Sequence, residues 1–196
     1  MKIRTLTLGA GLLAAALTLA GCTGTGTTGH SGGHSASPAT PAASAATFDD
    51  ADVAFATGMI AHHQQAVDMS DLLLAKDGVD PEVAALAERI KAAQGPEIET
   101  MEQWLAPWGH DAGHGGMDHG DGMMSEDDMA ALEEAAGAEA STLFLEQMIV
   151  HHEGAIAMSE TQLADGENPD ALALAERIIA DQTAEIAEMR GMLDAR

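Results

Sequence analysis

The chain contains the stretch Phe55-Ala-Thr-Gly-Met-Ile-Ala-His-His-Gln-Gln-Ala-Val-Asp-Met-Ser70, and it contains a second version of it. The second version reads Phe144-Leu-Glu-Gln-Met-Ile-Val-His-His-Glu-Gly-Ala-Ile-Ala-Met-Ser159. Phe, Met, His, His, Ala, Met and Ser recur at a constant offset of 89 residues. Each copy thus has two adjacent histidines with a methionine before and after them. The predictions of both fold and function start from this repeated motif.

Both copies place their histidines and methionines along one side of a helix. At ~100° per residue, His62 and Met69 share a stripe, with Met59 one turn before His62. Ala66 follows one turn after His62 and leaves room beside it. His63 points about a quarter-turn away, at the edge of the stripe. The second copy repeats the pattern with Met148, His151, His152 and Met158.

Two interpretations of this stripe compete. A methionine stripe at helical spacing is usually core filling, and a single buried histidine is usually only hydrogen-bonded. Two copies with a His-His pair favour metal ligands, since thioether and imidazole together suit soft ions, above all Cu(I). The predicted ligands are Met59, His62, His63, Met69, Met148, His151, His152 and Met158.

Composition predicts an all-α domain. The 196 residues suffice for one domain and a tail, helix-forming residues dominate, and Tyr is absent. The first hairpin, residues 48–106, is expected to hold helices at 49–76 and 81–105, with Asp80-Pro81 as the second start signal. Gly95-Pro96 is expected to interrupt and kink the second helix, and Pro107 to close it.

The second hairpin, residues 126–196, repeats this plan. Ser125-Glu-Asp-Asp128 resembles a capping box that starts a short helix, which Gly137 ends. Longer helices are expected at 138–163 and from Asn168-Pro169 to Asp194. Two repeated helical hairpins predict a four-helix bundle with an approximate internal twofold. The first helices of the two hairpins are expected to run parallel, with both His-His pairs at a similar height.

The second helix of each hairpin brings further candidate residues to the site. Glu97 lies on a face with Leu and Ile, where a carboxylate is unusual, so it is expected to accept the free N–H of His62. Glu185 would do the same for His151, and Met101 and Met189 complete the supporting set. The alternative is a glutamate that reaches past the edge of the stripe to solvent.

The connection between the hairpins, residues 107–125, is rich in Gly, His and Met. Histidine- and methionine-rich tracts often collect metal, whereas the alternative is a plain polar linker. Its candidate ligands are His110, His114, Met117, His119, Met123 and Met124.

The N-terminus predicts export and lipidation. Residues 1–21 have a basic start and a short apolar run, as a secretory signal does. The run ends Leu19-Ala20-Gly21-Cys22, which resembles a bacterial lipobox and makes Cys22, the only cysteine, the lipidated residue. An ordinary signal cut near Ala20 is the alternative. Residues 22–47 are expected to be a flexible tether, so that the protein sits on the outer face or periplasmic side of the membrane.

Charge excludes one class of partner. All 32 acidic residues but only 6 of the 8 Lys and Arg lie beyond residue 21, so the mature chain carries a net charge of −26. Such a charge opposes binding to nucleic acid and is typical of a solvated surface.

The repeated motif resembles the domain of unknown function 305 family, which includes CopM-like periplasmic copper-binding proteins. The likeness rests on Met-x-x-His-His-x-x-Ala-x-x-Met in both copies, and on the Gln94…Glu97-Ile98…Met101 and Gln182…Glu185-Ile186…Met189 segments. It covers residues 48–194 and implies a ferritin-like bundle outside the cytoplasm that binds copper. Pro96, whose repeat equivalent is Ala184, departs from the pattern.

Three functions are therefore open. The first is an extracytoplasmic lipoprotein that binds Cu(I), or silver, for sequestration, tolerance or transfer, without enzyme activity and with no identified protein partner. The second is a structural or partner-binding bundle without metal. The third is a di-metal oxidase, although such oxidases use a Glu-x-x-His motif where this chain has Met-x-x-His. Hydrolase chemistry lacks support because Ser70 and Ser159 fall on helices without a nucleophile turn.

Overall fold

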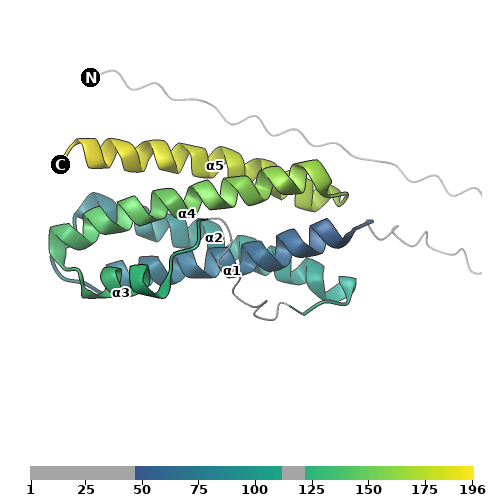
Figure 1. Cartoon of the computed structure of the whole chain (residues 1–196), viewed down its shortest axis with the longest axis horizontal. Coiled ribbons are helices and arrows are strands. Elements are labelled where there is room, and N and C mark those ends of the chain that lie inside the picture. The colour runs from purple at the N-terminus through teal and green to yellow at the C-terminus, as the bar shows by residue number, and fades with distance from the viewer. Residues whose placement is uncertain (1–46, 112–121) are drawn as a thin grey trace, which may run out of the picture. The chain divides into compact units, whose positions relative to one another are not determined.

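A computed structural model describes residues 47–111 and 122–196, which lie within one compact unit, Ala43–Arg196. These residues form helices and no strand, which confirms the all-α bundle (Figure 1). The helices are α1 (Asp50–Leu74), α2 (Pro81–Trp108), α3 (Glu126–Glu134), α4 (Gly137–Asp165) and α5 (Pro169–Asp194). The predicted signal, Cys22 and most of the tether lie outside the described residues, as do His114, Met117 and His119.

Apart from α4, which starts at Gly137 without a side-chain cap, the described helices begin where polar side chains satisfy their first N–H groups. Asp49 and Ser125 form capping boxes at the starts of α1 and α3. Asp80 and Asn168 cap α2 and α5, and each is followed by a proline at the first helical position. The start signals read from the sequence are thus confirmed, including the repeated cap-plus-proline device.

The predicted interruption of α2 is wrong. The helix continues through Gly95 and Pro96, and then through Pro107 as far as Trp108. A proline inside a helix removes one N–H and frees the carbonyl four residues earlier. Ala92 and Gln103, which precede the two prolines by four residues, are exposed, so water can satisfy those carbonyls. The stop comes instead at Gly109, which takes the left-handed conformation with φ 80°.

The direction of the hairpins also differs from expectation. The first helices of the two hairpins, α1 and α4, run antiparallel, as Figure 1 shows. Met158 near the end of α4 reaches Gly58 near the start of α1, and Asp52 bonds Gln162. The axis of the internal twofold is therefore perpendicular to the helices and not parallel to them. The His-His pairs still lie level because they occupy the middle of both helices.

A pair of equivalent contacts ties each hairpin to the turn of the other. The buried Asp52 carboxylate of α1 accepts hydrogen bonds from the Asn168 N–H at 3.0 Å and from Gln162 Nε2 at 2.5 Å. Ser141 of α4, its repeat equivalent, accepts the Asp80 N–H at 3.0 Å. Asp80 and Asn168 are themselves the equivalent N-caps of α2 and α5. Each first helix thus fixes where the second helix of the opposite hairpin begins.

The described end of the connecting segment is fastened across α1 and α4. The Gln65 side chain donates to the Met124 carbonyl at 2.9 Å and accepts the Met124 N–H at 2.7 Å. On the α4 side, a Cβ at Gly122 would lie 2.6 Å from the Val150 carbonyl oxygen, and φ there is +82°. Only glycine fits this approach. Gln65 and Gly154, which flank the segment, hold equivalent positions in the two repeats.

We expect Gln65→Ala to loosen this attachment. The change removes two hydrogen bonds, each contributing about 0.5–1.5 kcal/mol, so the free energy of unfolding should fall by about 1–2 kcal/mol. Exchange of the Met124 amide hydrogen should quicken more than exchange in the four long helices. Gln64→Ala is the matched control, because Gln64 is exposed and bonds only its helix neighbour Asp68. Equal effects of the two changes would contradict the assignment.

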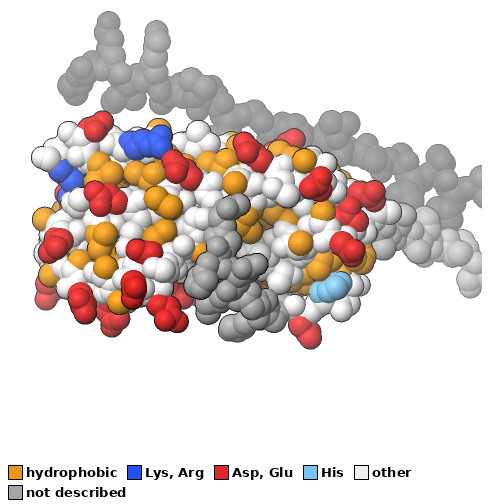
Figure 2. Space-filling view, viewed as in Figure 1, with side chains coloured by type: hydrophobic (Ala, Val, Ile, Leu, Met, Phe, Trp, Pro, Cys, Tyr) orange, Lys and Arg blue, Asp and Glu red, His pale blue; other side chains and the backbone are white. Residues whose placement is uncertain are grey.

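The surface of the bundle is predominantly acidic. Figure 2 shows Asp and Glu side chains spread over the visible face, with few basic ones between them. Among the described residues, ion pairs such as Arg89 with Glu188 and Arg190 with Glu153 join exposed side chains and contribute little each. Within the described ranges, none of the helices combines the length and apolar character that crossing a membrane requires.

Candidate metal centre

The apolar core of the bundle is divided into two clusters. The first cluster joins the second half of α1 and the first half of α2 to the first half of α4 and the end of α5. The second cluster joins the opposite ends of the same four helices. Between the clusters lies a set of polar side chains, which we call the histidine layer. Its members are His62, His63, Gln94, Glu97, His151, His152, Gln182 and Glu185.

The two motifs meet at the centre of this layer. The rings of His62 and His151 lie 3.7 Å apart between centroids, at an interplanar angle of 38°. His63 and His152 flank them at 6.5 and 6.4 Å from their own neighbours. All four histidines are buried, with at most 1% of each residue exposed. Residues 89 positions apart in sequence are thus brought together by the antiparallel packing of α1 and α4.

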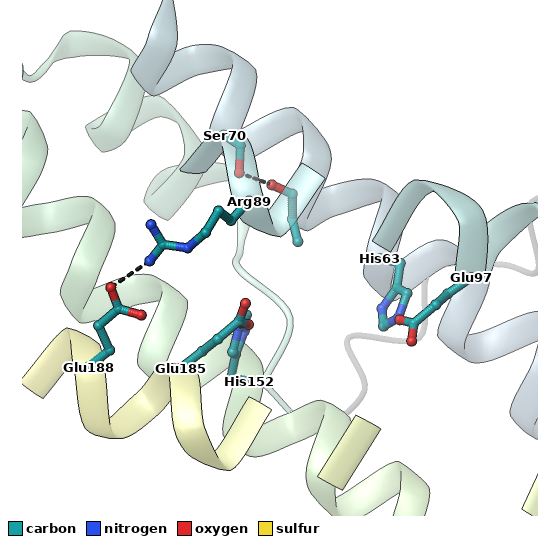
Figure 3. A network of polar contacts seen from close by, with 8 residues as sticks. His63, Ser70, Arg89, Glu97, His152, Glu185 and Glu188 are labelled. Carbon is teal, nitrogen blue, oxygen red and sulfur yellow. Dashed lines mark hydrogen bonds and ion pairs between the residues drawn. The ribbon is translucent and has the colours of Figure 1, made fainter. Parts of the chain in front are cut away.

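The outer histidines are held by glutamates from the second helices. His63 Nε2 donates to Glu97 Oε2 at 2.8 Å, and His152 Nε2 donates to Glu185 Oε2 at 2.7 Å (Figure 3). The glutamates accept histidine N–H groups as predicted, but the predicted partners, His62 and His151, are wrong. Residues 63 and 152 sit at the edge of the stripe and therefore face the neighbouring helix of their own hairpin. The glutamate side chains keep 22% and 21% of their area exposed, so the carboxylates remain hydrated.

These hydrogen bonds leave the other ring nitrogen of each outer histidine available. Nδ1 of His63 and Nδ1 of His152 are buried without a hydrogen-bond partner, as are Oε1 of Gln94 and Oε1 of Gln182. A buried polar atom left unpaired costs roughly 1–3 kcal/mol, so such a layer is not explained by stability. The glutamines recur at equivalent positions, and that recurrence was the sequence signal that could have assigned them to the site.

Burial also affects the protonation of His151. Desolvation, followed by repulsion from the neighbouring histidines His62, His152 and His63, holds the pKa of His151 well below its ordinary value. A hydrogen bond with the His62 backbone opposes this effect without cancelling it. His151 is therefore neutral near pH 7, which is the form that ligates metals.

The methionines lie on both sides of the histidine layer. Met59 and Met101 belong to the second cluster, against which the partly exposed Met158 packs. Met69, Met148 and Met189 are fully buried members of the first cluster. The methionines of one motif are therefore separated: Met59 lies on one side of the layer and Met69 on the other. The prediction that the methionines of each motif converge on one place is therefore wrong, because they lie on both sides of the layer.

The loop candidates are placed differently. His110, beyond the end of α2, is exposed and lies outside both clusters. Met124 is buried in the first cluster, and Met123 is half-buried beside it. Across residues 47–111 and 122–196, no group of three or more His, Cys, Asp or Glu side chains is arranged to hold a metal ion. The candidate ligand sets are instead combinations of imidazole with thioether.

If the histidine layer holds a soft ion such as Cu(I), Glu97→Gln and Glu185→Gln, made together, should weaken its binding by about 10–100-fold. Loss of a partner that orients a ligating histidine has an effect of this size on metal affinity. The measurement is a competition titration with a Cu(I) chelator. Glu99→Gln on the exposed side of α2 is the control and should leave the affinity unchanged. An affinity for the double variant equal to that of the control would contradict the role given to the two glutamates.

Comparison with known proteins agrees with this architecture. Residues 52–193 match the family described as Domain of unknown function (DUF305). The chain belongs to the DUF305 family. Among solved structures, it is similar to a DUF305 fragment from Deinococcus radiodurans, at 32% identity and a TM-score of 0.69, covering 77% of this chain and 99% of that one. No match was found among curated proteins.

Two further DUF305 relatives bear on location and ligands. A Streptomyces coelicolor member described as secreted shares 30% identity over 74% of this chain and 93% of its own, with a TM-score of 0.66. CopM in its Cu(I)-bound form shares 31% identity over 74% of this chain and 96% of its own, with a TM-score of 0.63. CopM has also been solved with Cu(II), with Ag and in the apo form.

Proposed function

We propose that this DUF305 protein binds a soft metal ion, Cu(I), in the histidine layer and the methionines beside it. The observation that supports this proposal most strongly is that both motifs meet at one buried polar layer. Neutral imidazole and thioether groups lie there, and the Nδ1 atoms of His63 and His152 have no hydrogen-bond partner. Sulfur and imidazole ligands favour Cu(I) over hard cations such as Mg²⁺ or Ca²⁺. Silver, also a soft ion, is expected to bind at the same place.

The chemistry favours binding over catalysis. A centre with buried histidines and soft ligands shields an ion from water and from competing reactants, as sequestration, tolerance or transfer of copper requires. The bound forms of CopM support copper and silver as guests. The ferritin-type oxidase is less suited, because the two carboxylates present, Glu97 and Glu185, bond histidines. We therefore propose a metal-binding protein without enzyme activity of its own.

Location follows from the N-terminal signals and the relatives. The Streptomyces coelicolor relative, described as a "putative secreted protein", supports export of this chain. We further propose that Cys22 carries the lipid anchor, so that residues 22–47 tether the bundle to the outer face or periplasmic side of the membrane.

The test is metal analysis of the mature chain with and without added copper, followed by titration against a Cu(I) chelator. We expect Cu(I) to be retained at chelator concentrations that strip a scrambled peptide of the same His and Met content. Retention no better than that of the peptide would refute the proposal. Bound iron together with oxygen consumption would favour the oxidase instead.

A further inference from the structure

Equivalent methionines of the two repeats lie in the cores on the two sides of the histidine layer, and the first cluster holds Met124, Met129 and Met192 in addition. On one side lie Met59 of α1, Met101 of α2 and Met158 of α4, which we call the first trio. On the other side lie Met148 of α4, Met189 of α5 and Met69 of α1, the second trio. Each trio therefore contains one methionine from each repeated motif and one from a second helix.

The internal twofold exchanges the two trios. Met59 is equivalent to Met148, Met101 to Met189, and Met69 to Met158, at the offsets of 89 and 88 found in the sequence. Each trio combines methionines from both motifs because α1 and α4 pack antiparallel. The end of α4 therefore lies beside the start of α1, where Met158 Cε is 3.0 Å from a Cβ added at Gly58. A small side chain accompanies each trio: fully buried Ala155 belongs to the same cluster as the first, and Ala66 to that of the second.

We infer that the bundle holds two equivalent soft-metal sites, one on each side of the histidine layer, and that each site takes its methionines from both repeats. The inference rests on the proposed function and adds the stoichiometry and the membership of each site. The histidine layer lies between the trios, so imidazole nitrogens are near both. Neither repeat alone contains a whole site, because its two motif methionines lie on opposite sides of the layer.

The test uses pairs of Met→Leu changes in the whole chain, since leucine is similar in volume and such exchanges usually cost less than ~1.5 kcal/mol. M59L with M158L removes two members of the first trio. M59L with M69L removes two methionines of one motif, and hence one from each trio. Ag(I) serves as the air-stable probe. Ions retained against a chelator are counted by native mass spectrometry, and methionine methyl resonances report which side is occupied.

Wild type should retain two ions. The M59L/M158L protein should retain one ion with an affinity within about threefold of wild type, and Ag(I) should shift the methyl signals of Met69, Met148 and Met189 but not that of Met101. The M59L/M69L protein should have no site of wild-type affinity. One ion in wild type, or identical titrations for the two variants, would overturn the inference while leaving the proposed function intact. No retained ion in wild type would overturn both.

Discussion

Replacing His62 and His151 together by alanine is expected to lower the Cu(I) affinity by at least about 100-fold, beyond the effect of losing an outer partner. These two rings lie at the centre of the histidine layer, 3.7 Å apart, and both are fully buried. The measurement is competition with a Cu(I) chelator, with helix content checked by circular dichroism.

Two further variants serve as controls for this experiment. His110→Ala removes an exposed imidazole and should leave the retained copper unchanged. Exchanging His62 and His151 for leucine fills the space with apolar atoms of similar size, so the metal-free variant should be as stable as wild type or more so. It should still lose the same copper affinity. Copper binding at wild-type strength in the leucine variant would show that the central pair is core filling.

Asp52→Ala is expected to give the largest loss of stability, about 2–4 kcal/mol, because several buried donors lose their acceptor at once. The carboxylate accepts from Gln162 Nε2 and from the N–H groups of Asn168, Glu167 and Asp49. These bonds fix the turn between α4 and α5 against α1. Urea unfolding at neutral pH measures the effect. Asp50→Ala, an exposed neighbour on the same helix, should change stability by less than about 0.5 kcal/mol.

The contribution of Asp52 should also depend on pH. Burial by itself would raise its pKa, but the hydrogen bonds from Asp49, Gln162, Asn168 and Glu167 outweigh it and bring the pKa below the ordinary value of 3.8. A carboxyl with a lowered pKa in the folded state stabilises above its unfolded pKa, and that stability is lost as pH falls through the folded pKa. The stability difference between wild type and Asp52→Asn should therefore be full at pH 7 and shrink below about 3.8. A difference that persists unchanged into acid would contradict this.

Local signals in the sequence predicted the elements well. Capping residues such as Asp80 and Asn168, each followed by proline, marked helix starts because their chemistry acts within one turn. The continuation of α2 through Pro96 and Pro107 was missed, because whether a freed carbonyl meets water depends on which side of the helix faces solvent. That orientation is a property of the packed bundle.

The site was predicted in composition but not in arrangement. The repeat identified His62, His63 and their equivalents, yet helical periodicity alone cannot say whether α1 and α4 run parallel or antiparallel. Antiparallel packing places Met59 and Met69 on opposite sides of the histidine layer. The contact of Glu97 with His63 has a different origin: a hairpin brings the edge residues of its own two helices together. The contact of Asp52 with the α4–α5 turn joins segments distant in sequence and left no local signal.

The most direct test of the metal centre is X-ray absorption spectroscopy at the copper edge, on the mature chain loaded with Cu(I). The structure predicts a shell containing both thioether sulfur and imidazole nitrogen, with the sulfur contribution reduced in M59L/M69L, which lacks one methionine of each trio, and the imidazole contribution reduced in the variant lacking His62 and His151. A shell of oxygen and nitrogen alone, unchanged by these substitutions, would place copper on the acidic surface and contradict the account.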